Sequence, residues 1–126
     1  MKRTIWINVG ESSLPMRCTV GAIEKLYERY GSIEGFSSAI GDPTKSMSAI
    51  MDSMELFIAQ GCAYENLFNR TLPDFPEGGY KPVPRQILEC AYAMDDFPDL
   101  AKKVIECLNL SMTNSIKAKE AKGKKK

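Results

Sequence analysis

The chain of 126 residues contains no histidine, and its four cysteines are far apart. Without histidine there is no side chain whose ordinary pKa lies near neutrality, so the commonest general base is missing. The cysteines also form no Cys-x-x-Cys pair, whereas the ligands of structural zinc sites usually come as closely spaced pairs. We therefore expect no enzyme activity, no metal site and no cofactor. We interpret the thiols as buried small apolar groups; they belong to Cys18, Cys62, Cys90 and Cys107.

Long apolar runs are also missing. No stretch approaches the roughly 20 residues that cross a bilayer, and the apolar part of the N-terminus is too short for a signal peptide. We therefore expect no membrane association and a location in a cytoplasm.

A phosphate-binding loop is absent too, because Gly78-Gly79 stands in a proline-rich segment with no helix directly after it. The acidic cluster at 95–99 lacks the alternating oxygen ligands of a calcium loop, and we interpret it as a solvated helix junction.

Charge is unevenly placed along the chain. The net charge is +1, but residues 117–126 hold six Lys and one Glu, which leaves −4 on residues 1–116. This lysine-rich tail has no apolar face, and we expect it to be disordered. It has no interleaved aromatic residues and follows an acidic body, so a nucleic-acid partner is not expected. Two interpretations of the lysine-rich tail stay open. In the first it makes the protein more soluble. In the second it reflects an A-rich stretch of the message before the stop codon, which would permit ribosomal slippage.

The N-terminal part predicts a β-hairpin over residues 3–18. Polar and apolar residues alternate from 3 to 9, which is typical of a strand. Residues 10–13 have turn chemistry, and 14–18 can return as a second strand if Pro15 sits at an edge or a strand start. An exposed edge could drive self-association into a homo-oligomer, with Ile5 and Ile7 as the residues involved.

Residues 19–116 predict about five helices. The chain length suits one domain, so we expect a mainly α protein with a small N-terminal β-hairpin (α+β) in a single domain over 1–116. The expected helices begin at 20, 33, 43, 84 and 98. Thr19 and Asp42 are the expected N-caps of the first and third, and Gly31 ends the first. The third helix reaches about residue 60, or bends at Gly61 and continues.

Between the third and fourth helices, residues 71–84 contain four Pro and two adjacent Gly. This composition forbids regular structure. A loop of about 14 residues indicates either a function or local mobility.

The third helix has an apolar stripe that is rich in methionine. Methionine is flexible and polarizable, so such a surface can repack around different partners. The same stripe is equally typical of a core helix, and both interpretations hold if the helix lies in an oligomer interface. The candidate partner-binding residues are Met47, Ile50, Met51, Met54, Phe57 and Ile58, with Trp6 on the hairpin as an aromatic anchor.

The join between hairpin and first helix resembles the opening of the tail assembly chaperones of long-tailed bacteriophages and related prophage proteins. These proteins have a small β element, a helix that starts with Thr-Val/Ala-Gly-Ala, and a Glu followed by a Tyr/Phe-Gly pair that closes this helix. A mostly α-helical body follows. The resemblance covers residues 3–40. The matching positions are Thr19, Val20, Gly21, Ala22, Glu28, Tyr30 and Gly31.

This resemblance implies a protein that binds the tape measure protein and helps to recruit tail tube subunits. It implies a location in the cytoplasm of the bacterial host and absence from the mature virion. Many members of the family also have a longer form that arises by programmed frameshift, and the terminal lysine run fits a short form that ends near its slip site. Two other classes stay open. A structural tail or head–tail joining component would be present in purified particles, and a small DNA-binding regulator would bind duplex DNA in a salt-dependent manner.

Overall fold

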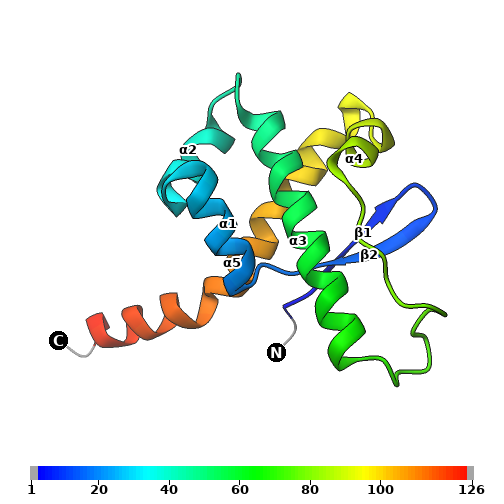
Figure 1. Ribbon diagram of the computed structural model, residues 1–126. Coiled ribbons are helices and arrows are strands. Elements are labelled where there is room, and N and C mark those ends of the chain that lie inside the picture. The colour runs from blue at the N-terminus through cyan, green and yellow to red at the C-terminus, as the bar shows by residue number, and fades with distance from the viewer. Residues whose placement is uncertain (1–2, 125–126) are drawn as a thin grey trace.

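A computed structural model describes the backbone of residues 3–124 and the side chains of residues 3–112. The expected fold class is confirmed: an antiparallel hairpin is followed by five helices (Figure 1). The elements are β1 (Ile5–Val9), β2 (Ser12–Met16), α1 (Val20–Tyr30), α2 (Ile33–Gly41), α3 (Ser46–Phe68), α4 (Arg85–Ala91), the 3-10 turn η1 (Met94–Asp96) and α5 (Phe97–Lys124).

The hairpin turn is tighter than the sequence suggested. β2 begins at Ser12, so only Gly10 and Glu11 connect the strands, and Val9 pairs with Ser12. Gly10 has a φ of 61°, the left-handed conformation that a two-residue II′ turn needs at its first position. The expectation of a four-residue turn was wrong because two residues suffice to reverse the chain.

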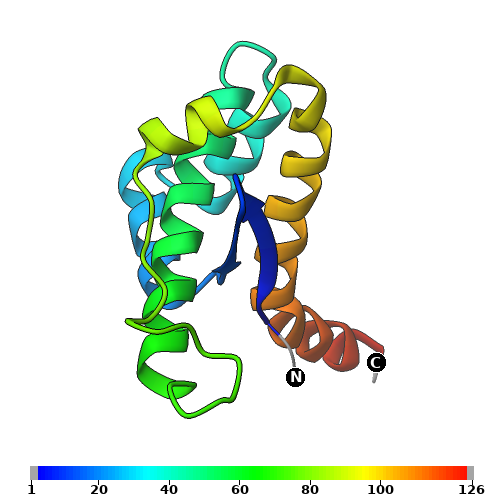
Figure 2. The same ribbon diagram turned by 90° about the vertical axis from the view of Figure 1, so that its right-hand side faces the viewer.

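The hairpin lies between α3 and α5 (Figure 2). Ile7, Val9, Leu14 and Met16 are buried in the core. β2 also packs directly on α3, where the Arg17 backbone N–H donates to the Phe57 carbonyl at 2.9 Å.

α3 is the central helix, and it contacts β2, α1, α2, α4 and α5. It runs through Gly61 to Phe68 without interruption. Its start differs from the expected one, since Ser46 rather than Pro43 is the first helical residue. Asp42 instead fixes a short turn, in which its carboxylate accepts from the Thr44 backbone N–H at 2.9 Å.

The other helix ends follow the sequence closely. The Thr19 hydroxyl accepts from the Ala22 N–H at 3.2 Å and so caps α1. Gly31 ends α1 with a φ of 82°. α5 begins at Phe97, one residue before the expected Pro98, directly after η1.

The proline-rich segment 71–84 has no helix or strand, as expected, but it is held by specific contacts. The Asn66 side chain donates to the Tyr80 carbonyl at 2.9 Å and accepts from the Tyr80 N–H at 2.8 Å. The Tyr80 ring lies 5.5 Å from the Trp6 ring and 5.6 Å from the Phe75 ring. These contacts tie the loop to α3 and β1.

One expectation about the thiols was wrong. Cys18, Cys62 and Cys107 are buried, but Cys90 is exposed. Cys90 lies on the outer side of α4, which turns Leu88 into the core instead.

Two further expectations concern membrane association and the lysine-rich tail. Within the part that the structure describes, no helix is long and apolar enough to cross a membrane. We expected the lysine-rich tail at 117–126 to be disordered, but α5 continues through Lys124, so the tail's backbone is helical as far as that residue. The side chains of the tail, and its last two residues altogether, lie outside the part that the structure describes.

Candidate functional site

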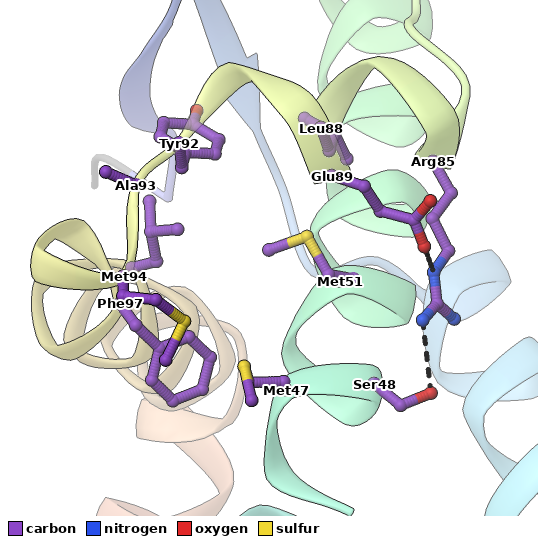
Figure 3. Close-up of a pocket in the computed structure, with 11 residues that line it drawn as sticks. Met47, Ser48, Met51, Arg85, Leu88, Glu89, Tyr92, Ala93, Met94 and Phe97 are labelled. Atoms are coloured by element: carbon purple, nitrogen blue, oxygen red, sulfur yellow. Dashed lines mark hydrogen bonds and ion pairs between the residues drawn. The ribbon is translucent and has the colours of Figure 1, made fainter.

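An open apolar groove lies between the first half of α3, α4 and the start of α5 (Figure 3). Its volume is about 250 Å³. We call it the Met groove, because three methionines line it. The lining residues are Met47, Ser48, Met51, Arg85, Leu88, Glu89, Tyr92, Ala93, Met94, Phe97 and Leu100.

The apolar residues of the Met groove divide into a floor and a rim. Leu88 and Leu100 are buried and form the floor. Met47 from α3 and Met94 from η1 both line the groove (Figure 3), and they are 48% and 69% exposed. Exposed methionines can adjust their three rotatable bonds to the shape of a bound apolar surface. The groove can therefore accept side chains of varied shape.

Polar contacts fix the opposite side of the groove. The Arg85 guanidinium pairs with Glu89 at 2.8 Å and donates to the Ser48 hydroxyl at 3.3 Å. It also pairs with Asp52, which pairs in turn with Arg29 of α1 at 3.2 Å. One carboxylate thus connects α1, α3 and α4 and sets the distance between α3 and α4.

The start of α4 is held by the same region of α3. Pro84 precedes the helix and its side chain gives no cap, but the Glu55 carboxylate accepts from the Arg85 backbone N–H at 2.7 Å. A carboxylate is favourable there because the first N–H groups of a helix lack partners and carry partial positive charge. The long side chain of Glu55 therefore replaces a local cap.

The Met-rich stripe of α3 serves two roles. Met47 and Met51 line the groove, as a partner-binding surface requires. The other four residues have no exposed surface, because the hairpin and the other helices surround them. The prediction that these four residues contact a partner must be corrected, because they belong to the core; they are Ile50, Met54, Phe57 and Ile58.

Trp6 lies apart from the Met groove. It is 41% exposed and packs on Tyr80 of the loop. As an anchor it would belong to a different surface from Met47 and Met51.

The hairpin does not offer Ile5 and Ile7 as a self-association edge. Ile7 is 3% exposed and Ile5 is partly buried against the core. Two carbonyls of β1 accept from side chains of later elements: that of Asn8 from the Tyr92 hydroxyl at 2.6 Å, and that of Trp6 from the Lys103 ammonium at 3.5 Å. α3 covers β2. The prediction of a self-association edge is corrected because the apolar strand residues face the core, and because elements later in the chain cover the edge. Self-association by another surface stays a prediction.

Sequence reasoning missed the η1 side of the groove. Met94 and Phe97 come from a segment that we interpreted only as an interruption between helices. Their spacing with Leu100, three residues apart in each case, was the available signal, since residues three apart share a helix face.

A second exposed apolar cluster was also missed. Leu67, Phe68 and Leu72 at the end of α3 are 75%, 69% and 50% exposed. The Phe68 ring lies 4.9 Å from that of Tyr64, over which the Arg17 guanidinium stacks at 3.6 Å. Leu72 of this cluster also lines a small hollow with Trp6 and Tyr80.

Among the described residues there is no group of three or more Cys, Asp or Glu side chains that could hold a metal ion. Tyr92 also lines the groove, and burial raises the pKa of its hydroxyl to about 12. Comparisons of the chain with protein-family models, with curated proteins and with solved structures found no match.

Proposed function

We propose that this protein is a tail assembly chaperone of the long-tailed phage type. In this proposal it acts in the cytoplasm of the bacterial host, binds the tape measure protein, helps to recruit tail tube subunits and is absent from the mature virion. The resemblance of residues 3–40 supports the class. The Met groove, with exposed Met47 and Met94 above an apolar floor, is the observation that supports the binding role.

The physical argument starts from the needs of such a partner. A tape measure protein is a long helix-forming chain whose apolar faces would aggregate if left bare. A groove between helices can cover one such face in a helix-in-groove manner. A groove of about 250 Å³ holds only a few side chains, so a single contact is weak. Many copies along one long chain would gain avidity from multivalency.

Co-expression tests this proposal. The protein is produced together with the long tail protein encoded beside it, and the solubility of that protein is measured with and without this chain. We expect rescue and co-purification. Met94→Lys should abolish both, because it puts a charge on the rim of the groove. Val20→Lys is the matched control, since Val20 is 87% exposed at the start of α1, outside the groove.

The alternatives give different outcomes. Suppose that the chain neither rescues the tail protein nor forms a complex with it, and that the chain is present in purified particles. The proposal of a chaperone would then be replaced by that of a structural tail or head–tail joining component. Salt-dependent binding to duplex DNA would favour a regulator instead. Rescue that Met94→Lys leaves intact would keep the chaperone but move its binding surface away from the Met groove.

A further inference from the structure

A small hollow lies where β1, the end of α3 and the loop at 71–84 meet. Its volume is about 60 Å³. We call it the aromatic hollow, because three aromatic side chains line it together with two carboxylates. It shares no lining residue with the Met groove, so it is a separate candidate site. The aromatic residues are Trp6, Phe75 and Tyr80, and the acidic residues are Glu65 and Asp74.

The three rings are steeply inclined to one another. The ring centres of Trp6 and Tyr80 are 5.5 Å apart, and the angle between their planes is 57°. Those of Phe75 and Tyr80 are 5.6 Å apart at 90°. Rings at such angles do not form a flat stack, which would suit a planar group. Several aromatic rings around one site are instead typical of the recognition of compact ammonium groups, which are attracted to the ring faces.

The two carboxylates of the hollow carry negative charge that no cation balances. Glu65 is only 7% exposed, and its Oε2 accepts from the Asn69 side chain. Its other oxygen has no partner among the described side chains, yet no such atom is enclosed without one, so this oxygen stays accessible. Burial and the charges of Asp74 and Glu65 raise the pKa of the Tyr80 hydroxyl. The negative field of both carboxylates therefore reaches the rings.

Positive side chains of the neighbouring segments do not fill the hollow. Among the described residues, no Lys or Arg lines it. The Arg70 guanidinium carbon lies 5.7 Å from the centre of the Phe75 ring, and its Nε donates to the Asn66 carbonyl at 3.3 Å. Lys81 and Lys103 line other hollows. In the described part of the chain, none of these cations forms an ion pair with the two carboxylates of the lining.

We propose that the aromatic hollow binds the ammonium end of a lysine side chain from a partner polypeptide. A space of about 60 Å³ holds the end of one side chain, whereas pockets for drug-sized molecules span roughly 300–1,000 Å³. The end of α5 and the loop at 71–84 lie on opposite sides of the molecule (Figures 1 and 2). The lysine-rich tail of the same chain is therefore a poor occupant. This inference goes beyond the proposed function and does not depend on the Met groove.

The fluorescence of Trp6 tests the proposal, because Trp6 is the single tryptophan of the chain and lines the hollow. Two end-blocked pentapeptides are titrated into the full-length protein, Gly-Gly-Lys-Gly-Gly and the same peptide with norleucine in place of lysine. We expect a saturable change with the lysine peptide and binding about tenfold weaker or more with the norleucine peptide. Salt should weaken the binding of the lysine peptide. In a third titration, n-butylammonium chloride represents a free amine, and it should bind no more tightly than the lysine peptide.

Substitutions in the loop locate the effect. Asp74→Asn should weaken binding of the lysine peptide by about threefold or more, because it removes one of the two charges of the lining. Glu77→Gln is the matched control, since it removes a charge from an exposed residue of the same loop that does not line the hollow. Phe75→Leu keeps an apolar side chain but removes a ring, and should also weaken binding by about threefold. Arg70→Gln should not weaken it, because Arg70 repels the ammonium.

Several outcomes would overturn this inference. One is equal affinity for the lysine and norleucine peptides, and another is an equal effect of Asp74→Asn and Glu77→Gln. Binding of n-butylammonium without binding of the lysine peptide would assign the hollow to a free amine instead. An oligomer of the protein alone that Asp74→Asn dissolves in sedimentation would assign the lysine to a second copy of the chain. The co-expression experiment decides the chaperone separately, since its variant Met94→Lys lies in the Met groove.

Discussion

Gly61 of α3 lies against the carbonyl of Pro15 in β2, so close that a Cβ at position 61 would be 2.1 Å from the Pro15 oxygen. Only a residue without a side chain permits this approach. Beside it, the Arg17 N–H donates to the Phe57 carbonyl. The position of the hairpin on the central helix thus depends on one glycine.

Gly61→Ala should destabilise the protein by about 2 kcal/mol or more, because the added methyl group meets backbone that cannot move without shifting the hairpin. Urea unfolding measures the change. Gly41→Ala is the control, since Gly41 is the last residue of α2 and nothing lies within 4 Å of the Cβ that alanine would add. Alanine should be neutral or slightly stabilising there. Equal effects at both positions would contradict the proposed close contact.

Asp52→Asn should lower the free energy of unfolding by about 1 kcal/mol. The change removes the charge that pairs with Arg29 and Arg85, while their partial exposure keeps the loss small. The stability measurement is again urea unfolding. Lys25→Gln breaks the pair with Glu28, in which both side chains are more than half exposed, and should have no measurable effect. An Asp52→Asn protein as stable as the parent would show that the Asp52 carboxylate does not help to hold α4.

One thiol per folded chain should react quickly with a chromogenic disulfide reagent. Cys90 is exposed, whereas Cys18, Cys62 and Cys107 are buried. The reaction is followed by absorbance in native buffer and then in denaturant, where all four thiols should react. Cys90→Ala should abolish the fast phase, and two or more fast thiols in the native protein would contradict the burial.

Stability should fall at alkaline pH. Burial raises the pKa of Cys18 and Cys62 to about 11 and that of Cys107 to about 12, from an ordinary value of 9.0. The unfolded chain therefore releases these protons at lower pH than the folded chain. The stability contributed by the neutral thiols is complete below pH 9 and is lost as the pH rises through 11 to 12.

The measurement is the free energy of unfolding at several pH values between 8 and 12. Cys107→Ala should flatten the slope above pH 9, because it removes one of the linked protons. Cys90→Ala is the control and should leave the slope unchanged. A slope that is the same in all three proteins would contradict the role of the buried thiol.

Asn66→Ala should release the loop at 71–84. The change removes both hydrogen bonds to the Tyr80 backbone, so the Tyr80 amide should exchange its hydrogen faster by about tenfold or more. Asn66→Asp keeps an acceptor for the Tyr80 N–H and should preserve part of the protection. Unchanged exchange in Asn66→Ala would show that the aromatic contacts of Tyr80 hold the loop alone.

Much of the local structure was predictable because its causes are local. Thr19 and Gly31 mark the ends of α1 through hydrogen bonding and a left-handed backbone. The alternation over residues 3–9 predicted β1. The start of α3 was harder to predict, because Asp42 and Pro43 suit a turn as well as a helix start.

The candidate site was predictable only in part. The stripe on α3 has one period, but its residues face different neighbours: Met47 and Met51 border the groove, whereas Ile50 is enclosed. No sequence pattern within one helix distinguishes these environments, since the burial of a side chain depends on which other elements cover its face of the helix. The other side of the groove comes from Met94 and Phe97, more than 40 residues later.

By itself, the sequence determined the class of elements, their order and most of their ends, because capping, periodicity and chain-breaking residues act over a few neighbouring positions. The tertiary structure alone decided which apolar residues are enclosed, that Cys90 is exposed, that the Asn8 carbonyl of β1 accepts from Tyr92, and that segments from two distant parts of the chain line one groove. These outcomes depend on long-range packing, in which a single contact such as Gly61 on Pro15 sets how one element lies on another.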